Sequence, residues 1–310
     1  MQIMKFKSFA LCLLLAGGLS ASCISEDNSD CYNVYNLALS YLGDGTQEIF
    51  PDKINTVDLY VFDSNSTCVS SSRLSDADVK ARMTRLPYLE TGTYRIVCIG
   101  NAYETQVENL DSKNLSAITF AAKDYINGET VSGNDSLYWS AIDYEIEPFS
   151  AYKTEEEVKT ALFASSHYDV VVEVVNAPAN VGKHPKIEII GTSPQTDFNN
   201  VAKGTPETYV MTTVSDGDRL TTAKSNIMRN LNHEEVYLKV TGEDGNEVAL
   251  INFAEHLEKY KDKIDPDLNE CIIPFRIEYN DKSTQINITL PSWYIELVTP
   301  IFNRTPLCIN

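Results

Sequence analysis

The chain has 310 residues, and its 44 acidic against 25 basic side chains give a formal net charge of −19 at pH 7. A surface this acidic repels nucleic acid and anionic lipid, which argues against both as partners. The length suggests about two domains. Aromatic residues form 10% of the chain, and this content favours folded cores over long disordered stretches.

The first 22 residues have the layout of a secretory signal peptide. Lys5 and Lys7 precede the apolar run of residues 9–16, and small residues then lead up to Cys23. The run is too short to cross a bilayer, which takes about 20 residues. Cleavage before Cys23 is therefore predicted. It removes both lysines and no acid, so the mature charge becomes 23 − 44, or −21.

Residues 19–23, Leu-Ser-Ala-Ser-Cys, resemble the bacterial lipobox, in which the cysteine is acylated and becomes the first mature residue. They depart from that pattern at Ser20, where Leu is usual. The resemblance implies lipid such as palmitate on Cys23, and two or three acyl chains hold a protein stably at a membrane. Residues 23–32 are interpreted as an acylated tether, whose acidic part resembles the signal that sends some lipoproteins to the outer face of the outer membrane. Ordinary secretion with a chance cysteine is the alternative.

Cleavage and lipidation would leave five cysteines, an odd number, so at least one is a free thiol or pairs between chains. Cys31 lies just before the predicted strand 34–42, and Cys68 lies just after the predicted strand 57–62. If these strands pair antiparallel, the two cysteines come within disulfide reach, which makes Cys31–Cys68 a candidate disulfide. No Cys-x-x-Cys occurs, so the sequence supports neither a zinc knuckle nor a thioredoxin-type site.

Strands dominate the predicted secondary structure. Segments rich in Val, Ile, Leu and Tyr, separated by turns with Gly, Asp or Asn, are typical of strands. These segments are residues 34–42, 57–62, 93–99, 168–175, 186–190, 236–241, 247–251, 275–279 and 285–290. The turn sequence of residues 242–246 predicts a hairpin between two of them, because its Gly and Asn residues tolerate positive φ.

Three short helices are predicted from capping patterns. Ser75 followed by acidic residues predicts a helix that begins at residue 76. Residues 154–157, Thr-Glu-Glu-Glu, resemble a capping box and predict a second helix with Val158, Ala161 and Leu162. Asn252 predicts a third, in which Phe253, Leu257 and Tyr260 share one face.

The polar region of residues 148–166 interrupts the strands, so a domain boundary is expected near residue 165. Short strands on both sides, without the helices that parallel crossovers need, predict an all-β chain with a few short helices. The expected organisation is a signal peptide at 1–22, the tether at 23–32, and β-sandwich domains at 33–165 and 166–310.

The sequence carries no pattern that points to catalysis or to a cofactor. The four histidines lack metal-ligand spacing, and no nucleophile elbow, P-loop or dinucleotide fingerprint appears. Neither a catalytic residue nor a metal site nor a cofactor is therefore predicted, and the chain is not expected to be an enzyme. With 44 acids, neighbouring carboxylates carry no information about a glycosidase, so that class stays open as the least favoured.

The arrangement as a whole resembles the FimB-like fimbrial anchor subunits of type V pili. The resemblance rests on the lipoprotein leader with Cys31 soon after Cys23, on residues 57–63, on residues 89–97 followed by Gly100-Asn101, and on residues 170–175, 186–191 and 236–264. It implies two transthyretin-like β-sandwich domains and a lipid-anchored protein of the outer membrane, exposed at the cell surface. It also implies that the protein tethers a pilus, limits its length, and contacts stalk subunits through strand complementation.

Two alternatives remain beside the anchor. Stalk and tip subunits of these pili are released by cleavage after an early arginine, whereas here the first arginine after Cys23 is Arg73. This favours a retained anchor, although Lys53 offers another cleavage position. The second alternative is a surface glycan-binding lipoprotein. Such proteins display exposed aromatic platforms, for which Trp139 and Trp293 are few and more often pack in a core, although the 17 tyrosines could substitute.

Overall fold

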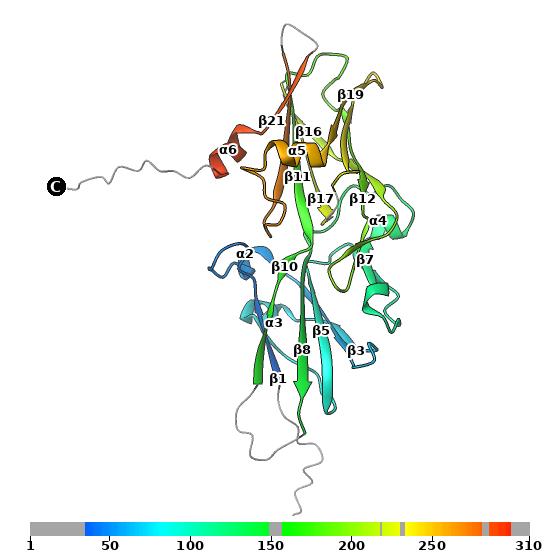
Figure 1. Ribbon diagram of the computed structural model, residues 1–310, viewed down its shortest axis with the longest axis vertical. Coiled ribbons are helices and arrows are strands. Elements are labelled where there is room, and N and C mark those ends of the chain that lie inside the picture. The colour runs from blue at the N-terminus through cyan, green and yellow to red at the C-terminus, as the bar shows by residue number, and fades with distance from the viewer. Residues whose placement is uncertain (1–34, 149–156, 218, 230–232, 281–284, 299–310) are drawn as a thin grey trace, which may run out of the picture.

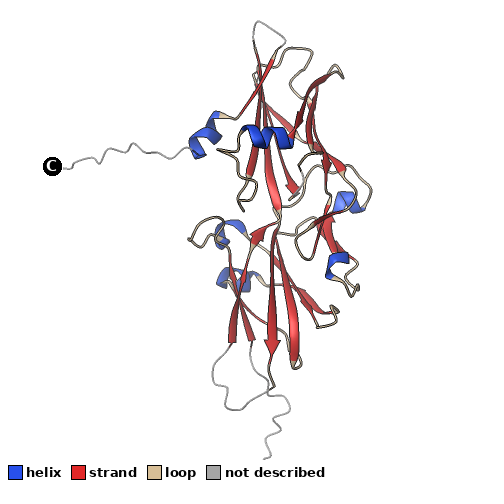
Figure 2. Ribbon diagram, viewed as in Figure 1, coloured by secondary structure: helices blue, strands red, loops and turns tan. Residues whose placement is uncertain are grey.

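Strands grouped into sheets make up most of the computed structural model, which describes residues 35–148, 157–217, 219–229, 233–280 and 285–298. A few short helices lie between them (Figures 1 and 2). The predicted all-β class is therefore confirmed. In the described residues, no helix is long and apolar enough to cross a membrane.

Two sheets enclose the core at the lower end of the molecule in Figure 1. One has the order β4-β1-β9, formed by Met83–Arg85, Tyr35–Ser40 and Glu157–Leu162. The other has the order β10-β8-β5-β2-β3, formed by Ala164–Ser165, Tyr138–Ile146, Gly92–Gly100, Val57–Phe62 and Cys68–Arg73. Buried side chains such as Leu37, Phe50, Leu59, Ile96 and Tyr144 pack between these sheets.

Two further sheets enclose the core at the upper end. The first has the order β16-β17-β11-β20-β21, formed by Thr213–Asp216, Leu220–Met228, His167–Val175, Ile272–Tyr279 and Ile286–Thr289. The second has the order β15-β12-β18-β19, formed by Glu207–Met211, Lys186–Thr192, Tyr237–Thr241 and Glu247–Asn252. The β18–β19 pair confirms the predicted hairpin, with Gly245 in its turn at φ +80°.

A fifth sheet joins strands from distant parts of the sequence. Its order is β14-β13-β7-β6, formed by Ala202–Lys203, Gln195–Asp197, Thr119–Ala122 and Thr105–Glu108. A third cluster of buried side chains likewise draws on both sides of residue 165, including Phe62, Ile99, Phe120, Phe198 and Met228. The two halves of the chain thus share one sheet and one core cluster, while a domain boundary near residue 165 stays a prediction.

The helices are short and lie between strands. They are α2 (Phe50–Lys53), α3 (Asp76–Ala81), α4 (Lys123–Ile126), α5 (Phe253–Lys259) and α6 (Ser292–Val298), with a 3-10 turn at Leu115–Ala117. Two predicted caps are confirmed. The Ser75 hydroxyl accepts a hydrogen bond from the Asp78 N–H at 3.2 Å, and the Asn252 side-chain oxygen Oδ1 accepts one from the Glu255 N–H at 3.0 Å.

The helix predicted from the capping box at 154–157 is wrong. Residues 154–156 lie outside the described part, and residues 157–162 form β9, which pairs in parallel with β1. Ala161 and Phe163 are buried whereas Val158 and Leu162 are exposed, so from Ala161 the chain shows the period of two that belongs to a strand. Tertiary pairing with β1 overrides the local capping signal, as weak helix propensity allows.

The strand pairing that motivated the candidate disulfide is also wrong. The strand after Cys31, β1, pairs with β4 and β9, whereas β2 pairs with β3 and β5 in another sheet. Cys31 lies outside the described residues, and Cys68 is half-buried with a raised thiol pKa because of that burial. The Cys31–Cys68 disulfide therefore stays a prediction, without the argument from strand pairing.

A pH dependence of stability is expected from His256 on α5. Its ring is buried, stacks on Phe275 with centroids 4.1 Å apart, and donates from Nε2 to the Pro274 carbonyl at 2.9 Å. Burial lowers the pKa of His256 to about 4. Because the unfolded chain binds this proton near pH 6.5, the contribution of His256 is complete above that pH and is lost as pH falls toward 4.

We expect His256→Gln to flatten the fall in unfolding free energy between pH 7 and pH 4, measured by urea denaturation at several pH values. Burial also lowers the pKa of His167 and His233, so a residual slope of the same sign remains. His184→Gln, at an exposed position, is the matched control and should keep the slope of the unchanged protein. Equal slopes for both variants would contradict the role of His256.

Candidate functional site

The first described strand, β1, is built into the middle of its sheet. It pairs antiparallel with β4 and parallel with β9, over three and six residue pairs. Tyr35, Leu37 and Leu39 alternate inward and are buried, and Tyr41 follows with no exposed surface. Loss of β1 would therefore remove a central strand and expose apolar surface that it now covers. Tyr35 lies only 35 − 23 = 12 positions after Cys23, which itself lies outside the described residues.

Arg73 and Lys53, the basic residues nearest the N-terminus at which cleavage could release the protein, both bond to other segments of the fold. Arg73, at the end of β3, makes a bidentate contact with Asp58 at 2.7 and 2.8 Å and donates to the Ala102 carbonyl at 2.6 Å. Lys53, at the end of α2, forms an ion pair with Glu270. Cleavage after Lys53 would remove β1 and α2 together.

The outer strands of the lower sheets present backbone edges. β3 pairs with β2 and is an outer strand among the described ones; most of its side chains are exposed. β9 is the outer strand beside β1, and its Val158 and Leu162 are exposed. Exposed edges are the usual template for pairing with a strand of another chain. These two strands are therefore candidate contact surfaces.

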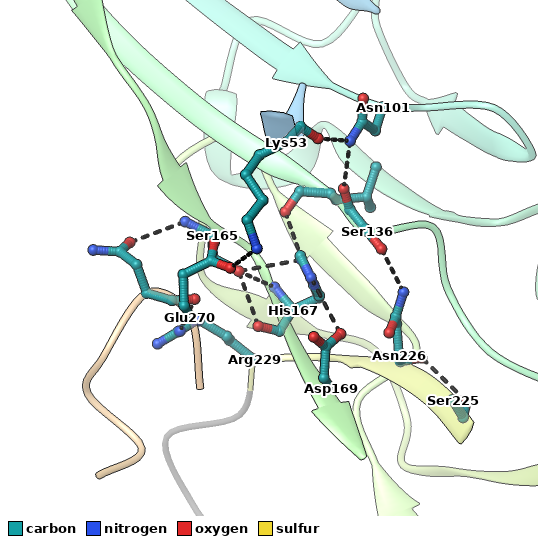
Figure 3. A network of polar contacts seen from close by, with 12 residues as sticks. Lys53, Asn101, Ser136, Ser165, His167, Asp169, Ser225, Asn226, Arg229 and Glu270 are labelled. Carbon is teal, nitrogen blue, oxygen red and sulfur yellow. Dashed lines mark hydrogen bonds and ion pairs between the residues drawn. The ribbon is translucent and has the colours of Figure 1, made fainter. Parts of the chain in front are cut away.

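A polar network lies where the chain passes from the lower sheets to the upper ones, between β10 and β11 (Figure 3). His167 is buried there, and its Nδ1 donates to the Leu137 carbonyl at 2.9 Å. Its Nε2 lies 3.6 Å from Asp169. The Ser165 hydroxyl lies 3.2 Å from the same Nδ1 and donates to the His167 carbonyl at 3.0 Å.

This Ser-His-Asp set superficially resembles a catalytic triad, but its geometry differs. Ser165 and His167 are buried, and the serine hydrogen is committed to a backbone carbonyl. A triad needs an accessible hydroxyl that donates to the imidazole, with the carboxylate on the other ring nitrogen. Burial lowers the pKa of His167 and outweighs the opposing effect of Asp169. The arrangement fixes the crossing of the chain instead of presenting a nucleophile.

Asn101 holds three segments of the lower half together at this crossing. Its φ is +60°, a conformation that Asn adopts more readily than most residues. Its amide donates to the Lys53 carbonyl at 2.8 Å and to the Ser136 carbonyl at 3.3 Å. The Ser136 hydroxyl in turn accepts from the Asn226 amide at 2.7 Å. The network therefore continues from the lower half into β17 (Figure 3).

A loop of the upper half, residues 265–271, is held against the lower half. The Asp44 carboxylate accepts from the Asn269 N–H at 2.7 Å and from the Glu270 N–H at 2.9 Å. The Glu270 carboxylate accepts from the Tyr41 hydroxyl at 2.5 Å and pairs with Lys53. We call residues 265–271 the junction loop, because these bonds join it to the segment that follows β1.

Arg229, after β17, fixes the junction loop from the other side. Its guanidinium donates to the carbonyls of Pro266, Leu268 and Asn269, and it lies 4.8 Å from the ring centroid of Tyr168. Its backbone N–H donates to the Ser166 carbonyl at 3.0 Å. The junction loop is thus bonded to both halves, so its contacts restrict their relative movement.

We expect Asp44→Ala to weaken this connection. The variant loses two charge-assisted hydrogen bonds from backbone N–H groups and a longer one, 3.4 Å, from the Asn269 side-chain amide, all at an exposed position, which should cost about 1–2 kcal/mol. Hydrogen exchange should rise in residues 265–271 while the core strands keep their protection. Lys53→Ala should cost less, about 0–1 kcal/mol, because both partners of its ion pair are partly exposed.

Asp63→Ala is the matched control for the junction. The Asp63 carboxylate accepts from the N–H groups of Asn65 and Thr67 at 2.9 and 2.8 Å, all within one turn. This variant also loses two such bonds but should leave the exchange of the junction loop unchanged. Equal loosening of the loop by both variants would show that Asp44 does not act through its direct bonds.

The two tryptophans differ in their surroundings. Trp139 packs against the third core cluster and donates from Nε1 to the Phe198 carbonyl at 3.2 Å. Trp293, on α6, is 38% exposed and donates to Glu173 at 2.9 Å. Trp139 is thus a packing residue. In the part of the chain that the structure describes, no group of three His, Cys, Asp or Glu side chains is placed to hold a metal ion.

The site residues named from the sequence and those found in the structure differ. Cys23 and Cys31 lie outside the described residues, so their predicted roles stay predictions. The sequence did not indicate Asp44, Asn269, Glu270 or Arg229. The only local signal is the turn sequence Gly43-Asp44-Gly45, which marks a loop and says nothing of its partner.

Comparison with known proteins identifies the family. The model of the family described as "Fimbrillin-A associated anchor proteins Mfa1 and Mfa2" matches residues 28–299. This match covers most of the chain and agrees with the resemblance predicted from the sequence. Among curated proteins, none matches this sequence significantly.

Several solved structures share the fold. A candidate adhesin from Bacteroides ovatus is 18% identical, with a TM-score of 0.68 over 84% of this chain and 94% of that one. A proposed polysaccharide-binding protein from Bacteroides thetaiotaomicron is 13% identical, with a TM-score of 0.66 over 84% and 98%. The fimbrial anchor protein Mfa2 from Porphyromonas gingivalis is 16% identical, with a TM-score of 0.65 over 83% and 95%. At these identities the likeness establishes the fold alone.

Proposed function

We propose that this chain, which belongs to the family of fimbrillin-A associated anchor proteins, tethers a type V fimbrium to the outer membrane through lipid on Cys23 and limits the length of that fimbrium. A fimbrial role follows from the family. Lipid attachment, length control and contact through strands are the proposed parts. The observation that supports length control is the position of β1 in the centre of its sheet, and lipid attachment is supported by the lipobox-like residues 19–23.

Strand β1, which an uncleaved anchor keeps, would connect the lipid to the folded part of the protein. β1 is held by pairing on both sides and by its buried Leu37 and Leu39. Its first residue follows Cys23 by 12 positions (35 − 23). A lipid on Cys23 would therefore be covalently continuous with the middle of a sheet. Pulling on the fimbrium would load that sheet, from which separation requires the rupture of many backbone hydrogen bonds together.

The same strand offers a reason for the end of assembly. Subunits that join by strand complementation need a vacancy in one sheet that a neighbour's strand can complete. In this chain β1 already occupies the place between β4 and β9. A subunit without a vacancy there adds no further neighbour at that sheet, so growth of the polymer would stop at it.

Contact with the adjoining stalk subunit is assigned to an outer strand. β3 and β9 each span six residues, and their outer edges offer backbone groups for pairing. The junction loop would then carry load between the halves, because Asp44 and Arg229 bond it on opposite sides. A released tip or stalk subunit would have to vacate the place of β1 by cleavage after Lys53 or Arg73, and it fits less well because both side chains are engaged in contacts with other segments.

Deletion of the gene tests the proposal. We expect longer fimbriae that are shed into the medium, because nothing would end their growth or hold them, and reintroduction of the intact gene should restore length and retention. Fimbrial length is measured by electron microscopy, and shedding by quantifying the major subunit in the medium. Fimbriae of unchanged length that stay on the cells would overturn the proposal.

A further inference from the structure

A polar pocket of about 540 Å³ lies beside β17, away from the junction loop. Its walls come from residue 104 before β6, from residues 122–124 at the start of α4, from the loop 132–135 and from residues 224–226 of β17. No aromatic side chain lines it. The pocket therefore lacks the apolar and stacking surfaces that lipids, nucleobases and hydrophobic ligands need.

The floor of the pocket is held rigidly by the loop 132–135. The Ser225 hydroxyl donates to the Ser132 carbonyl at 2.9 Å, and the Asn134 N–H donates to the Asn226 carbonyl at 2.8 Å. Gly133 approaches β17 so closely that a Cβ there would lie 2.8 Å from the Ser225 hydroxyl. A floor fixed in this way lowers the ordering cost of binding a ligand.

Asn134 has an unused donor at this floor. Its side-chain oxygen accepts from the Tyr209 hydroxyl at 2.8 Å, while its Nδ2 is buried and has no partner. Buried donors are normally satisfied by protein, ordered water or a ligand. That nitrogen has almost no accessible surface, so an oxygen of a ligand can bond to it only after the Asn134 side chain turns toward the pocket.

The rim combines free groups of both charges. Lys123 and Lys224 are exposed, and neither makes an ion pair with a residue that the structure describes. Glu104, Asp124 and Asp135 line the same pocket, and Asp135 already accepts from the N–H groups of Tyr103 and Glu104 and from the Thr105 hydroxyl. Ammonium groups donate hydrogen bonds to hydroxyl oxygens, and carboxylates accept them from hydroxyl hydrogens. A ligand with many hydroxyl groups can use both kinds, whereas carboxylates in the rim repel a strongly anionic ligand.

From this geometry we infer that the pocket binds a neutral sugar residue of a polysaccharide. The hydroxyl groups of the sugar donate hydrogen bonds to Glu104 and Asp124 and accept them from Lys123 and Lys224. This binding activity is separate from the anchor role, because the pocket shares neither β1 nor the junction loop. An anchor with such a pocket would also attach to glycans near the cell surface.

The test uses the full chain in detergent, titrated with neutral gluco-, manno- and xylo-oligosaccharides and with galacturonic acid oligomers of equal length. Isothermal titration calorimetry gives affinities, and saturation-transfer NMR shows which sugar protons touch the protein. We expect at least one neutral oligomer to bind. Lys224→Gln and Glu104→Gln should each weaken its binding about tenfold through loss of a charge-assisted hydrogen bond.

Lys113→Gln is the matched control, since Lys113 is exposed and lies outside the pocket. It should leave the affinity unchanged, and thermal melts should show all three variants folded. Failure of every neutral oligomer to bind would overturn the inference. So would unchanged affinity in both pocket variants, or tighter binding of the galacturonic acid oligomer than of any neutral one.

Discussion

Replacement of Cys23 by Ala is expected to remove the protein from the outer membrane. Each buried methylene of an acyl chain contributes about 0.8 kcal/mol to membrane binding, and in the described residues no helix offers an alternative span. Two or three acyl chains on Cys23 would therefore account for stable retention by themselves. We expect the outer-membrane fraction to lose at least about nine-tenths of the protein, and incorporation of labelled fatty acid to disappear.

A second version of the variant is needed to distinguish loss of the lipid from failure of leader cleavage. An uncleaved leader could hold the Cys23→Ala chain at the inner membrane, so the variant is also expressed behind a leader that ordinary signal peptidase removes. Cys31→Ala is the matched control and should keep both the label and the membrane fraction. An unmodified Cys23 in mass spectrometry of the native N-terminus would refute lipid anchoring, whatever the fractionation shows.

The elements that the sequence predicted well share a strong local signal. Strands β2, β11, β12 and β19 are runs of apolar and β-branched residues, and their ends agree with prediction to within about two residues. The caps of α3 and α5 were found because Ser75 and Asn252 bond the N–H three positions ahead. Such signals depend only on neighbouring residues, so the sequence carries them without the fold.

The elements that were missed depend on distant partners. β3 contains three consecutive serines and forms at the edge of a sheet, where β2 supplies the pairing and exposure tolerates polar side chains. β13 pairs with β7, far away in the sequence. The contacts of the junction loop were missed for the same reason, because Asn269 and Asp44 are 225 positions apart in the sequence. No local pattern encodes such pairings.

The largest loss of stability is expected for Phe198→Ala. Phe198 follows β13, has no exposed surface, and accepts the Trp139 Nε1 hydrogen bond at its carbonyl. Its ring makes edge contacts with Tyr60, Phe62 and Phe120 at centroid distances of 5.0, 5.7 and 6.1 Å. Truncation leaves a cavity in a rigid core, which costs about 3–5 kcal/mol for a buried Phe.

The position of Phe198 makes this variant informative about more than the size of the stability loss. Its ring comes from the second half of the chain but packs on β2 and β7 of the first half, so the variant weakens the core cluster that both halves share. Urea denaturation should show the loss, and hydrogen exchange should rise first in β7 and β13. Leu250→Ala removes a side chain that is 52% exposed and should stay within about 0.5 kcal/mol of the unchanged protein. A loss below about 1 kcal/mol for Phe198→Ala would mean that the two halves do not depend on this cluster for their stability.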